Sequence, residues 1–257
     1  MKYSIILTTI LAGSFFMANA QQTAKPEDTE TWEPIPKSVV PGKALGDAPS
    51  DAIVLFDGKN LDEWVSNKDK TPAKWLVKDN ILTVNKSTGN IETKKLFTNY
   101  QLHIEWRVPA SITGTGQARG NSGIFLASIG DGDAGYELQV LDSYNNKTYV
   151  NGMAGSLYKQ AIPLANPGRK PGEWNIYDVA WTAPVFNEDG TIKSPAKATV
   201  FFNGVIVENG FELTGPTQYI GKPTYEGKKH GPAPIKLQAH GDKSEPLSFR
   251  NIWVREL

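Results

Sequence analysis

Apolar and polar residues alternate along short stretches of the chain, and this texture begins at residue 51. In QLHIEWRV (101–108) every second residue is apolar, and the same period recurs in GYELQVLD (135–142) and IKLQAH (235–240). A period of two places successive side chains on opposite faces of a β-strand. No long stretch keeps the period of a helix, and Gly, Pro, Asn and Asp separate the runs. The pattern therefore predicts an all-β domain.

The predicted strands are short and are bounded by turn residues. They are Ile53–Phe56, Trp75–Lys78, Ile81–Val84, Gln101–Val108, Ser122–Ala127, Tyr136–Leu141, Asn175–Trp181, Ala198–Phe202, Val205–Glu208, Ile235–His240 and Phe249–Glu256. Asp79-Asn80 and Asn203-Gly204 lie between paired runs, as hairpin turns do. Many short strands without intervening helices indicate a β-sandwich or jelly roll.

Several predicted strands carry polar side chains on a single face. Glu137 and Gln139 share one face of their strand, and Lys236, Gln238 and His240 share one face of theirs. Polar neighbours on such a face lie about 7 Å apart, roughly the length of a sugar ring. We therefore expect strands of this kind, side by side, to form a hydrogen-bonding surface.

Two further strands have the same alternation. His103, Glu105 and Arg107 are predicted to face away from Leu102 and its apolar neighbours in QLHIEWRV. In the last strand, strict alternation predicts two faces. Phe249, Asn251, Trp253 and Arg255 share one face, and Arg250, Ile252 and Val254 share the other.

The residues before 51 have a different composition. Residues 1–20 contain Lys2, an apolar middle and a final Ala-Asn-Ala, which predicts a secretory signal peptide cleaved before Gln21. The apolar run is shorter than the roughly 20 residues that a spanning helix needs, so no membrane insertion is expected after cleavage. Residues 21–50 are rich in Pro and are predicted to be a linker or strap. Residues 51–257 are predicted to be a single β-sandwich domain.

Charge and cysteine content narrow the function classes. Lys plus Arg number 27, Asp plus Glu also number 27, and there is no Cys. A chain without a basic patch is not expected to bind nucleic acid or an anionic membrane surface. Secretion without disulfides favours a protein of the periplasm or cell envelope of a bacterium.

Four motifs carry candidate chemistry, and each has a purely structural alternative. RGNSGIFL (119–126) has glycines on both sides of Asn121-Ser122, which suits either close approach of a ligand or a bulged strand start. IGDGDAG (129–135) lacks the spacing of an EF-hand and is interpreted as a plain loop. Tyr158 could line the rim of a site or cover the end of the sandwich. His240, at a strand end in Gln-Ala-His-Gly-Asp, could serve a site or be an ordinary surface or core histidine.

Metal and cofactor signatures are sparse. The sequence has no HExxH, no Cys pair, no GxSxG and no P-loop. No cofactor is therefore assigned, although a divalent cation stays open, with Glu137, His240 and Asp142 as its candidate ligands.

The motifs, taken in order, resemble those of the 3-keto-disaccharide hydrolase family over about residues 51–257. The matching stretches are FDGKNLDEW, QLHIEWRV, GNSGIFL, GYELQVLD, GSLYKQ, PGEWNIYDVAW, FFNGVIVENG, LQAHGD and FRNIWVREL. The resemblance implies a concanavalin-like β-sandwich, a jelly roll of two curved antiparallel sheets, and secretion by a bacterium. It also implies activity on glycosides whose glucose has been oxidised at C3 by a separate sugar 3-oxidoreductase.

The resemblance implies that the GYE-x-Q and LQ-x-HG strands lie on the concave sheet, over a carbohydrate substrate. The predicted catalytic residues are His240 and Glu137, and the predicted substrate-binding residues are Gln139, Gln238, Asn121, Ser122, Tyr158, Lys159 and Asp142. One position departs from the family: many members have an Arg shortly after the NSGIF-like stretch, where this chain has none. Lys159 is a candidate replacement for that Arg.

The chemistry follows from the number of carboxyl groups. An ordinary glycosidase needs two carboxyls across the anomeric carbon, and this chain offers only Glu137 plainly. A ketone at C3 acidifies the C2 hydrogen, so a base can remove it and the enolate can expel the C1 substituent. Either His240 or Glu137 could be the base, Gln139 and Gln238 could orient hydroxyls, and water would then add to complete hydrolysis. The alternative is a lectin-like, non-catalytic carbohydrate-binding module of the same fold.

Overall fold

The computed structural model describes residues 24–257, so the predicted signal peptide lies outside the described residues. The chain divides into two compact units, of which the first ends at Ser38 and the second spans Val39–Leu257. In the first unit, residues 24–38 are all exposed and contain one short 3₁₀ helix, η1 (Pro26–Thr29). No helix in the described part of the chain is long and apolar enough to cross a membrane.

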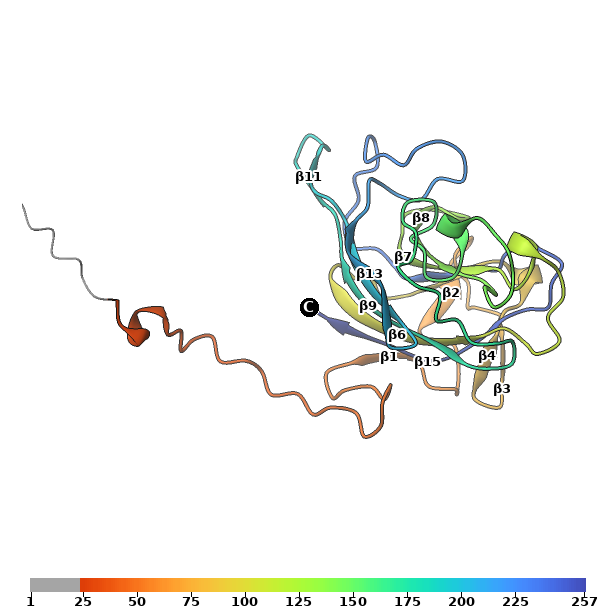
Figure 1. The fold of residues 1–257 in the computed structure, drawn as a ribbon, viewed down its shortest axis with the longest axis horizontal. Coiled ribbons are helices and arrows are strands. Elements are labelled where there is room, and N and C mark those ends of the chain that lie inside the picture. The colour runs from red at the N-terminus through yellow and green to blue at the C-terminus, as the bar shows by residue number, and fades with distance from the viewer. Residues whose placement is uncertain (1–23) are drawn as a thin grey trace, which may run out of the picture. The chain divides into compact units, whose positions relative to one another are not determined.

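The second unit is a β-sandwich of two antiparallel sheets (Figure 1). The larger sheet contains, in spatial order, β13 (Val205–Glu212), β12 (Lys197–Phe202), β9 (Asn175–Thr182), β6 (Tyr100–Arg107), β15 (Ser248–Glu256), β4 (Ile81–Thr83) and β3 (Leu76–Lys78), and β1 (Ile53–Phe56) pairs with β15. The smaller sheet contains β2 (Trp64–Ser66), β5 (Ile91–Thr93), β14 (Lys236–Leu237), β7 (Ser122–Ser128) and β8 (Gly135–Val140). The predicted jelly-roll class is confirmed.

Short elements complete the unit. They are the hairpin β10 (Val185–Phe186) and β11 (Ile192–Ser194), and the 3₁₀ helices η2 (Lys86–Thr88), η3 (Gly116–Ala118) and η4 (Val150–Gly152). The strands β2, β5, β10 and β11 are too short to show alternation in the sequence, and the prediction missed them. Both predicted hairpin turns are confirmed, since Asp79, Asn80, Asn203 and Gly204 all have positive φ.

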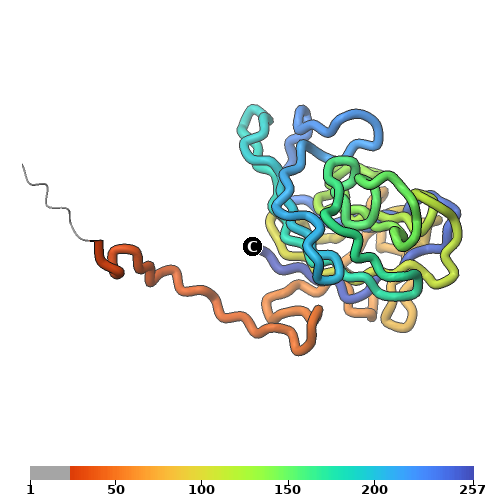
Figure 2. The backbone as a smooth tube through the Cα atoms, in the orientation of Figure 1, coloured from red at the N-terminus to blue at the C-terminus, as the bar shows by residue number. Residues whose placement is uncertain are grey.

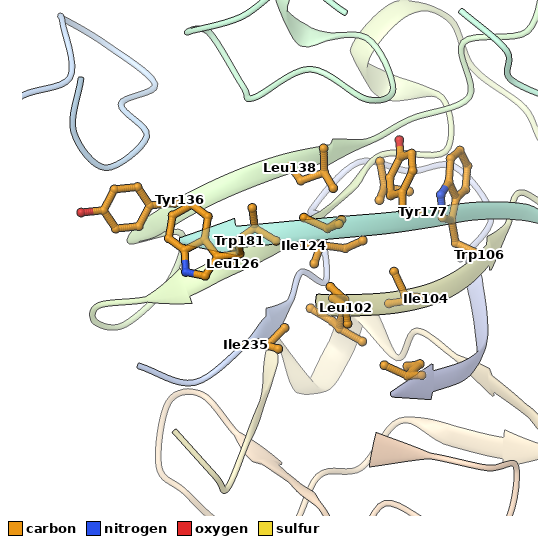
Figure 3. Packing of buried hydrophobic residues seen from close by; sticks show 14 of the residues in the cluster. Leu102, Ile104, Trp106, Ile124, Leu126, Tyr136, Leu138, Tyr177, Trp181 and Ile235 are labelled. Atoms are coloured by element: carbon orange, nitrogen blue, oxygen red, sulfur yellow. The ribbon is translucent and has the colours of Figure 1, made fainter. Parts of the chain in front are cut away.

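The core lies between the two sheets. Leu102, Ile104 and Trp106 of β6 are almost completely buried, and they face apolar residues of the smaller sheet such as Ile124 and Leu138 (Figure 3). The same figure shows Tyr177 and Trp181 of β9 in this layer. Because the apolar half of each alternating strand is used here, the polar half is left on the outer face of each sheet.

The alternation predicted for the last strand is wrong at its start. Phe249 is fully buried together with Ile252 and Val254, whereas strict alternation placed Phe249 on the opposite face from them. The reason is a β-bulge: the register between β15 and β6 shifts between Arg250 and Trp253, and Asn251 has a φ of 46°. One extra residue at a bulge reverses the facing of all residues beyond it.

The polar residues of β6 lie on the outer face of the larger sheet, far from the polar face of the smaller one. There, Nδ1 of His103 lies 2.6 Å from a carboxylate oxygen of Asp178, and its ring stacks on Trp253 with centroids 5.2 Å apart. The carbonyl of Gly46 accepts hydrogen bonds from Asn251 and from Trp253, each at 2.9 Å. The part of residues 21–50 that contains Gly46 is therefore fastened to the sandwich.

Candidate functional site

A cavity of about 500 Å³ lies over the polar face of the smaller sheet. It is lined by Gln117, Ala118, Asn121, Asp133, Glu137, Gln139, Tyr149, Tyr158, Thr217, Tyr219, Gln238, His240 and Asp242. The structure thus brings together six of the residues predicted to form the site. These are Glu137, Gln139, Gln238, His240, Asn121 and Tyr158.

Three neighbouring strands form the floor of the cavity. In β8, the core takes Tyr136, Leu138 and Val140, which leaves Glu137 and Gln139 on the cavity side. The central strand β7 lies between β8 and β14, and its Gly123 pairs with Gln139 on one side. On the other side, the amide of Gln238 donates to the carbonyl of Gly123 at 2.9 Å. β14 is shorter than predicted, but this hydrogen bond continues its pairing with β7.

Gly123 leaves the space that the side chain of Glu137 occupies. A Cβ added to Gly123 would lie 2.4 Å from Oε1 of Glu137, far inside van der Waals contact. The conformation of Gly123 is an ordinary extended one, so the absent side chain is what matters at this position. The carboxyl of Glu137 consequently leans over the middle of the floor.

Burial sets the protonation state of Glu137. The residue is only 6% exposed, and burial together with the charge of Asp133 raises its pKa to about 8, against a smaller opposing effect of Lys236. A carboxyl with this pKa is protonated at neutral pH and can donate a proton. Glu137 is therefore suited to act as a general acid.

Two buried side-chain amides on the floor have unused acceptors. Nε2 of Gln139 donates to Oδ1 of Asn121 at 3.1 Å, which fixes the orientation of the Gln139 side chain. The Oε1 atoms of Gln139 and Gln238 are buried and have no hydrogen-bond partner. Since buried acceptors are normally paired, these two oxygens are suited to accept hydrogen bonds from the hydroxyls of a ligand.

His240 is oriented by a buried carboxylate. Nδ1 of His240 lies 2.9 Å from Oδ2 of Asp242, whose side chain is only 3% exposed. When Nδ1 donates to this carboxylate, Nε2 is the nitrogen left to accept a proton. The pair thus has the arrangement of an oriented general base.

Asp242 is in turn held by two other side chains. The ammonium of Lys86 lies 3.1 Å from Oδ1 of Asp242, and the hydroxyl and the amide of Ser244 both donate to the same oxygen. Burial raises the pKa of Asp242, but the hydrogen bonds from His240, Ser244 and Lys86 outweigh this effect and hold the pKa far below its usual range. Asp242 is therefore a permanent anion beside His240.

The loop 129–135, interpreted from the sequence as plain, forms another wall. Lys236, fully buried on the same face as Gln238, donates to the carbonyls of Gly132 and Ala134 at 2.7 and 2.8 Å. These bonds hold the loop over the sheet, where its Asp133 reaches the cavity. Burial lowers the pKa of Lys236 to about 8, partly offset by nearby carboxylates that include Asp133.

The remaining predicted residues lie beside the cavity and do not line it. The hydroxyl of Ser122 donates to the carbonyl of Gln238 at 2.7 Å and so links the two strands. Asp142 pairs with Arg119 at 2.7 Å and accepts from the amide of Tyr144. Lys159 contacts a tyrosine of the rim, with its Nζ 4.2 Å from the centroid of the Tyr219 ring.

The predicted metal ligands do not form one cluster. Glu137 and His240 line the cavity, but Asp142 is engaged by Arg119. Among residues 24–257, no three His, Asp or Glu side chains are grouped so that they could hold a metal ion.

Sequence reasoning missed several residues of the cavity. They are Gln117, Ala118, Asp133, Tyr149, Thr217, Tyr219 and Asp242. For Asp242 a signal was present, because an Asp two residues after a His at a strand end can turn back onto the ring. The others come from loops without periodicity, and only the fold brings them to the sheet.

Comparisons with known proteins agree with this description. Residues 51–255 match the family model described as the 3-keto-alpha-glucoside-1,2-lyase-like domain. A 3-keto-disaccharide hydrolase from Bacteroides thetaiotaomicron is 31% identical over 153 residues. That alignment covers 48% of this chain and 50% of the relative, so it spans about half the length of each protein.

Solved structures are similar as well. A crystal structure of a candidate glycosyl hydrolase from Parabacteroides distasonis is 55% identical, with a TM-score of 0.84, and the match covers 91% of this chain and 97% of that one. Another candidate glycosyl hydrolase from the same species has 23% identity and a TM-score of 0.56, with 80% of this chain and 99% of that one covered. The second similarity shows the fold alone.

Proposed function

Because the chain belongs to the family of 3-keto-alpha-glucoside-1,2-lyase-like domains, we propose that it cleaves 3-keto-glucosides, including 3-keto-disaccharides, by elimination followed by hydration. The observation that carries the proposal is one cavity with two unlike titratable groups. His240 is oriented by the anion of Asp242, whereas Glu137 is buried and protonated. An oriented imidazole and a protonated carboxyl in one cavity can supply a base and an acid to the same ligand.

In the first step, His240 takes the proton from C2 of the sugar. The ketone at C3 makes this proton acidic, and the electrons of the broken C2–H bond form the enolate. Asp242 stabilises the imidazolium that results, since it is a buried anion 2.9 Å from Nδ1. General-base catalysis of this kind contributes about 10²–10⁴ in rate.

In the second step, the enolate collapses and the C1–O bond breaks. A C1=C2 double bond forms, the C3 ketone is restored, and the leaving oxygen takes a proton from Glu137. The hydroxyl of a water molecule then adds to C1 while its proton goes to Glu137, and the proton on His240 returns to C2, which completes net hydrolysis. This route needs one carboxyl, whereas ordinary glycosidases need two.

The floor amides would orient the sugar. The unpaired oxygens of Gln139 and Gln238 are buried, and the hydroxyls of a pyranose can donate to them. Leaving such acceptors unpaired costs about 1–3 kcal/mol each, and a ligand hydroxyl that pairs with one offsets part of this cost.

The biological setting is part of the proposal. Residues 1–20 have the pattern of a secretory signal, so we place the mature protein outside the cytoplasm, in the periplasm or envelope of a bacterium. Its substrate must be made by oxidation of a glucoside at C3, so a separate sugar 3-oxidoreductase is required upstream.

Incubation with matched 3-keto and unmodified glucosides, followed by product detection, tests the function. We expect rapid release of the leaving group from the 3-keto form and almost none from the unmodified form. Equal cleavage of both forms would contradict elimination. Binding of both forms without turnover would instead support the lectin-like alternative.

A further inference from the structure

One wall of the cavity consists of three tyrosines from separate segments of the chain. Tyr158 belongs to a segment that lies next to β8, because its amide donates to the carbonyl of Glu137 at 3.0 Å. The hydroxyls of Tyr149 and Tyr158 lie 2.5 Å apart, and the ring centroids 6.2 Å apart. Tyr219 belongs to the loop 214–231, which lies beside the segment that contains Tyr158 (Figure 2). We call these three residues the tyrosine wall.

Lys159 contacts all three residues of the tyrosine wall. Its Nζ donates to the carbonyl of Tyr219 at 2.6 Å and lies within 6 Å of all three ring centroids, at 4.2, 5.7 and 5.8 Å. Lys159 has a φ of 60°, which a residue with a side chain adopts only at a cost, and its amide donates to the carbonyl of Asn151 at 2.7 Å. The wall is therefore held in place before any ligand arrives.

The tyrosine wall offers aromatic surface to solvent at the cavity mouth. Tyr219 is 73% exposed and Tyr149 is 41% exposed. The residue next to Tyr219, Ile220, is 83% exposed. Exposed apolar surface beside a polar cavity is typical of a ligand-binding site.

The floor is long enough for more than one sugar ring. From Gln238 it crosses Gly123 of β7 and Gln139 of β8 before it reaches the segment of Tyr158. These are three steps between neighbouring strands, or about 14 Å, which is roughly twice the length of a pyranose. The strand of Glu137 is next to the segment of Tyr158, with the Glu137 carboxyl over Gly123 in the middle of the floor, and His240 comes from the opposite end.

We infer that the tyrosine wall is the leaving-group subsite, which accepts the flat apolar face of a second pyranose ring on Tyr219 and Tyr149. The inference rests on the proposed function, because that function makes Glu137 the acid beside the departing oxygen. A ring that leaves from this side of Glu137 is carried directly over the tyrosine wall. Aromatic faces favour the C–H face of a sugar, and each such pair contributes modestly beyond the buried area.

The test compares two substrates in three proteins. The substrates are a 3-keto-disaccharide and methyl 3-ketoglucoside, whose leaving group is too small to reach the tyrosine wall. The proteins are the wild type, Tyr219→Ala, and the matched control Tyr144→Ala, which removes a 40% exposed tyrosine that does not line the cavity. The quantity compared between proteins is kcat/KM for the disaccharide divided by kcat/KM for the methyl glycoside. Comparing this ratio cancels the different reactivities of the leaving groups.

We expect Tyr219→Ala to lower this ratio about tenfold, mostly through KM for the disaccharide, and to change kcat/KM for the methyl glycoside less than twofold. Tyr144→Ala should leave the ratio at the wild-type value. An unchanged ratio in Tyr219→Ala, or an equal loss on both substrates, would overturn the inference.

Calorimetric titration separates this inference from the proposed function. If wild type turned over neither keto substrate, the proposed function would fail, but unmodified disaccharide and methyl glucoside would still report on the tyrosine wall. Tyr219→Ala should then weaken binding of the disaccharide about tenfold and leave binding of methyl glucoside unchanged. Equal affinity changes for the two ligands, or none, would show that the wall is no second-ring subsite.

Discussion

The carboxyl of Glu137 occupies the place where a side chain of Gly123 would be, because a Cβ at residue 123 would lie 2.4 Å from Oε1. The two residues lie on paired strands, β8 and β7, at the centre of the cavity floor. The smallest residue of the floor thus determines where the proposed acid is held.

Gly123→Ala should therefore displace Glu137 and lower the rate on a 3-keto-glucoside by at least tenfold. Gly123 has an ordinary extended backbone and faces the cavity, so alanine fits the strand and the core is untouched. Steady-state kinetics and a thermal melt check this expectation. Gly231→Ala is the matched control, because a Cβ there would have no neighbour within 4 Å. A Gly123→Ala enzyme with normal kcat would show that the position of Glu137 is unimportant.

The raised pKa of Glu137 predicts a loss of activity at alkaline pH. Burial raises the pKa to about 8, so the proposed acid loses its proton above that pH and the rate should fall. Glu208 gives the control: burial raises its pKa to about 8 too, but Glu208 does not line the cavity. The pH–rate profile of Glu208→Gln should keep the alkaline fall of the wild type, and a profile that stays flat to pH 10 in wild type would contradict the assignment of Glu137.

The same two carboxyls predict how stability changes with pH. Their ordinary pKa is 4.5, and the folded values are about 8. Between these values the folded protein keeps protons that the unfolded chain releases, so stability falls as pH rises through this window. Glu137→Gln and Glu208→Gln should each reduce that fall, as measured by denaturant unfolding at pH 5 and pH 9. Unfolding curves with the wild-type pH dependence in both variants would show that neither pKa is raised.

His240 and its partner should be equally necessary for turnover. His240→Ala removes the proposed base and should lower kcat about a hundredfold or more. Asp242→Asn should cost about as much, because an amide at this position can donate to Nδ1 and so leave the proton on Nε2. His230→Ala is the control, since His230 contacts Tyr136 and does not line the cavity. Near-normal kcat in either active-site variant, with the fold shown intact by circular dichroism, would refute the assignment.

Truncation from the N-terminus should show a sharp boundary between Val39 and Asp51. A chain that begins at Val39 should melt like the mature protein, because residues 24–38 form a separate unit. A chain that begins at Asp51 loses the Gly46 carbonyl and with it two hydrogen bonds, from Asn251 and Trp253. At about 0.5–1.5 kcal/mol for each bond and about 2–4 °C for each kcal/mol in a domain of this size, Tm should fall by about 2–12 °C.

Activity should survive both truncations when it is measured well below Tm. The side chains that Gly46 contacts lie beside His103 on the larger sheet, whereas the cavity lies on the smaller one. Loss of kcat in the chain that begins at Asp51 would instead indicate that the two faces are coupled.

The sequence by itself determined which side chains of each regular strand share a face. Alternation in GYELQV and IKLQAH put Glu137 with Gln139, and Gln238 with His240, on polar faces, and in the structure all four line one cavity. This succeeds because the facing of a side chain depends only on the local backbone, which alternates strictly in an unbroken strand. Where a bulge at Asn251 breaks the strand, the same reasoning placed Phe249 on the wrong face.

Only the tertiary structure decided which polar faces meet. His103 and Glu137 are both polar residues of alternating strands, yet His103 lies on the larger sheet and Glu137 lines the cavity. The reason is that strand order depends on pairings between distant segments. The carboxylate beside His240 and the tyrosine wall likewise come from loops without periodicity. Their positions are fixed by hydrogen bonds and packing across the fold, which no local pattern records.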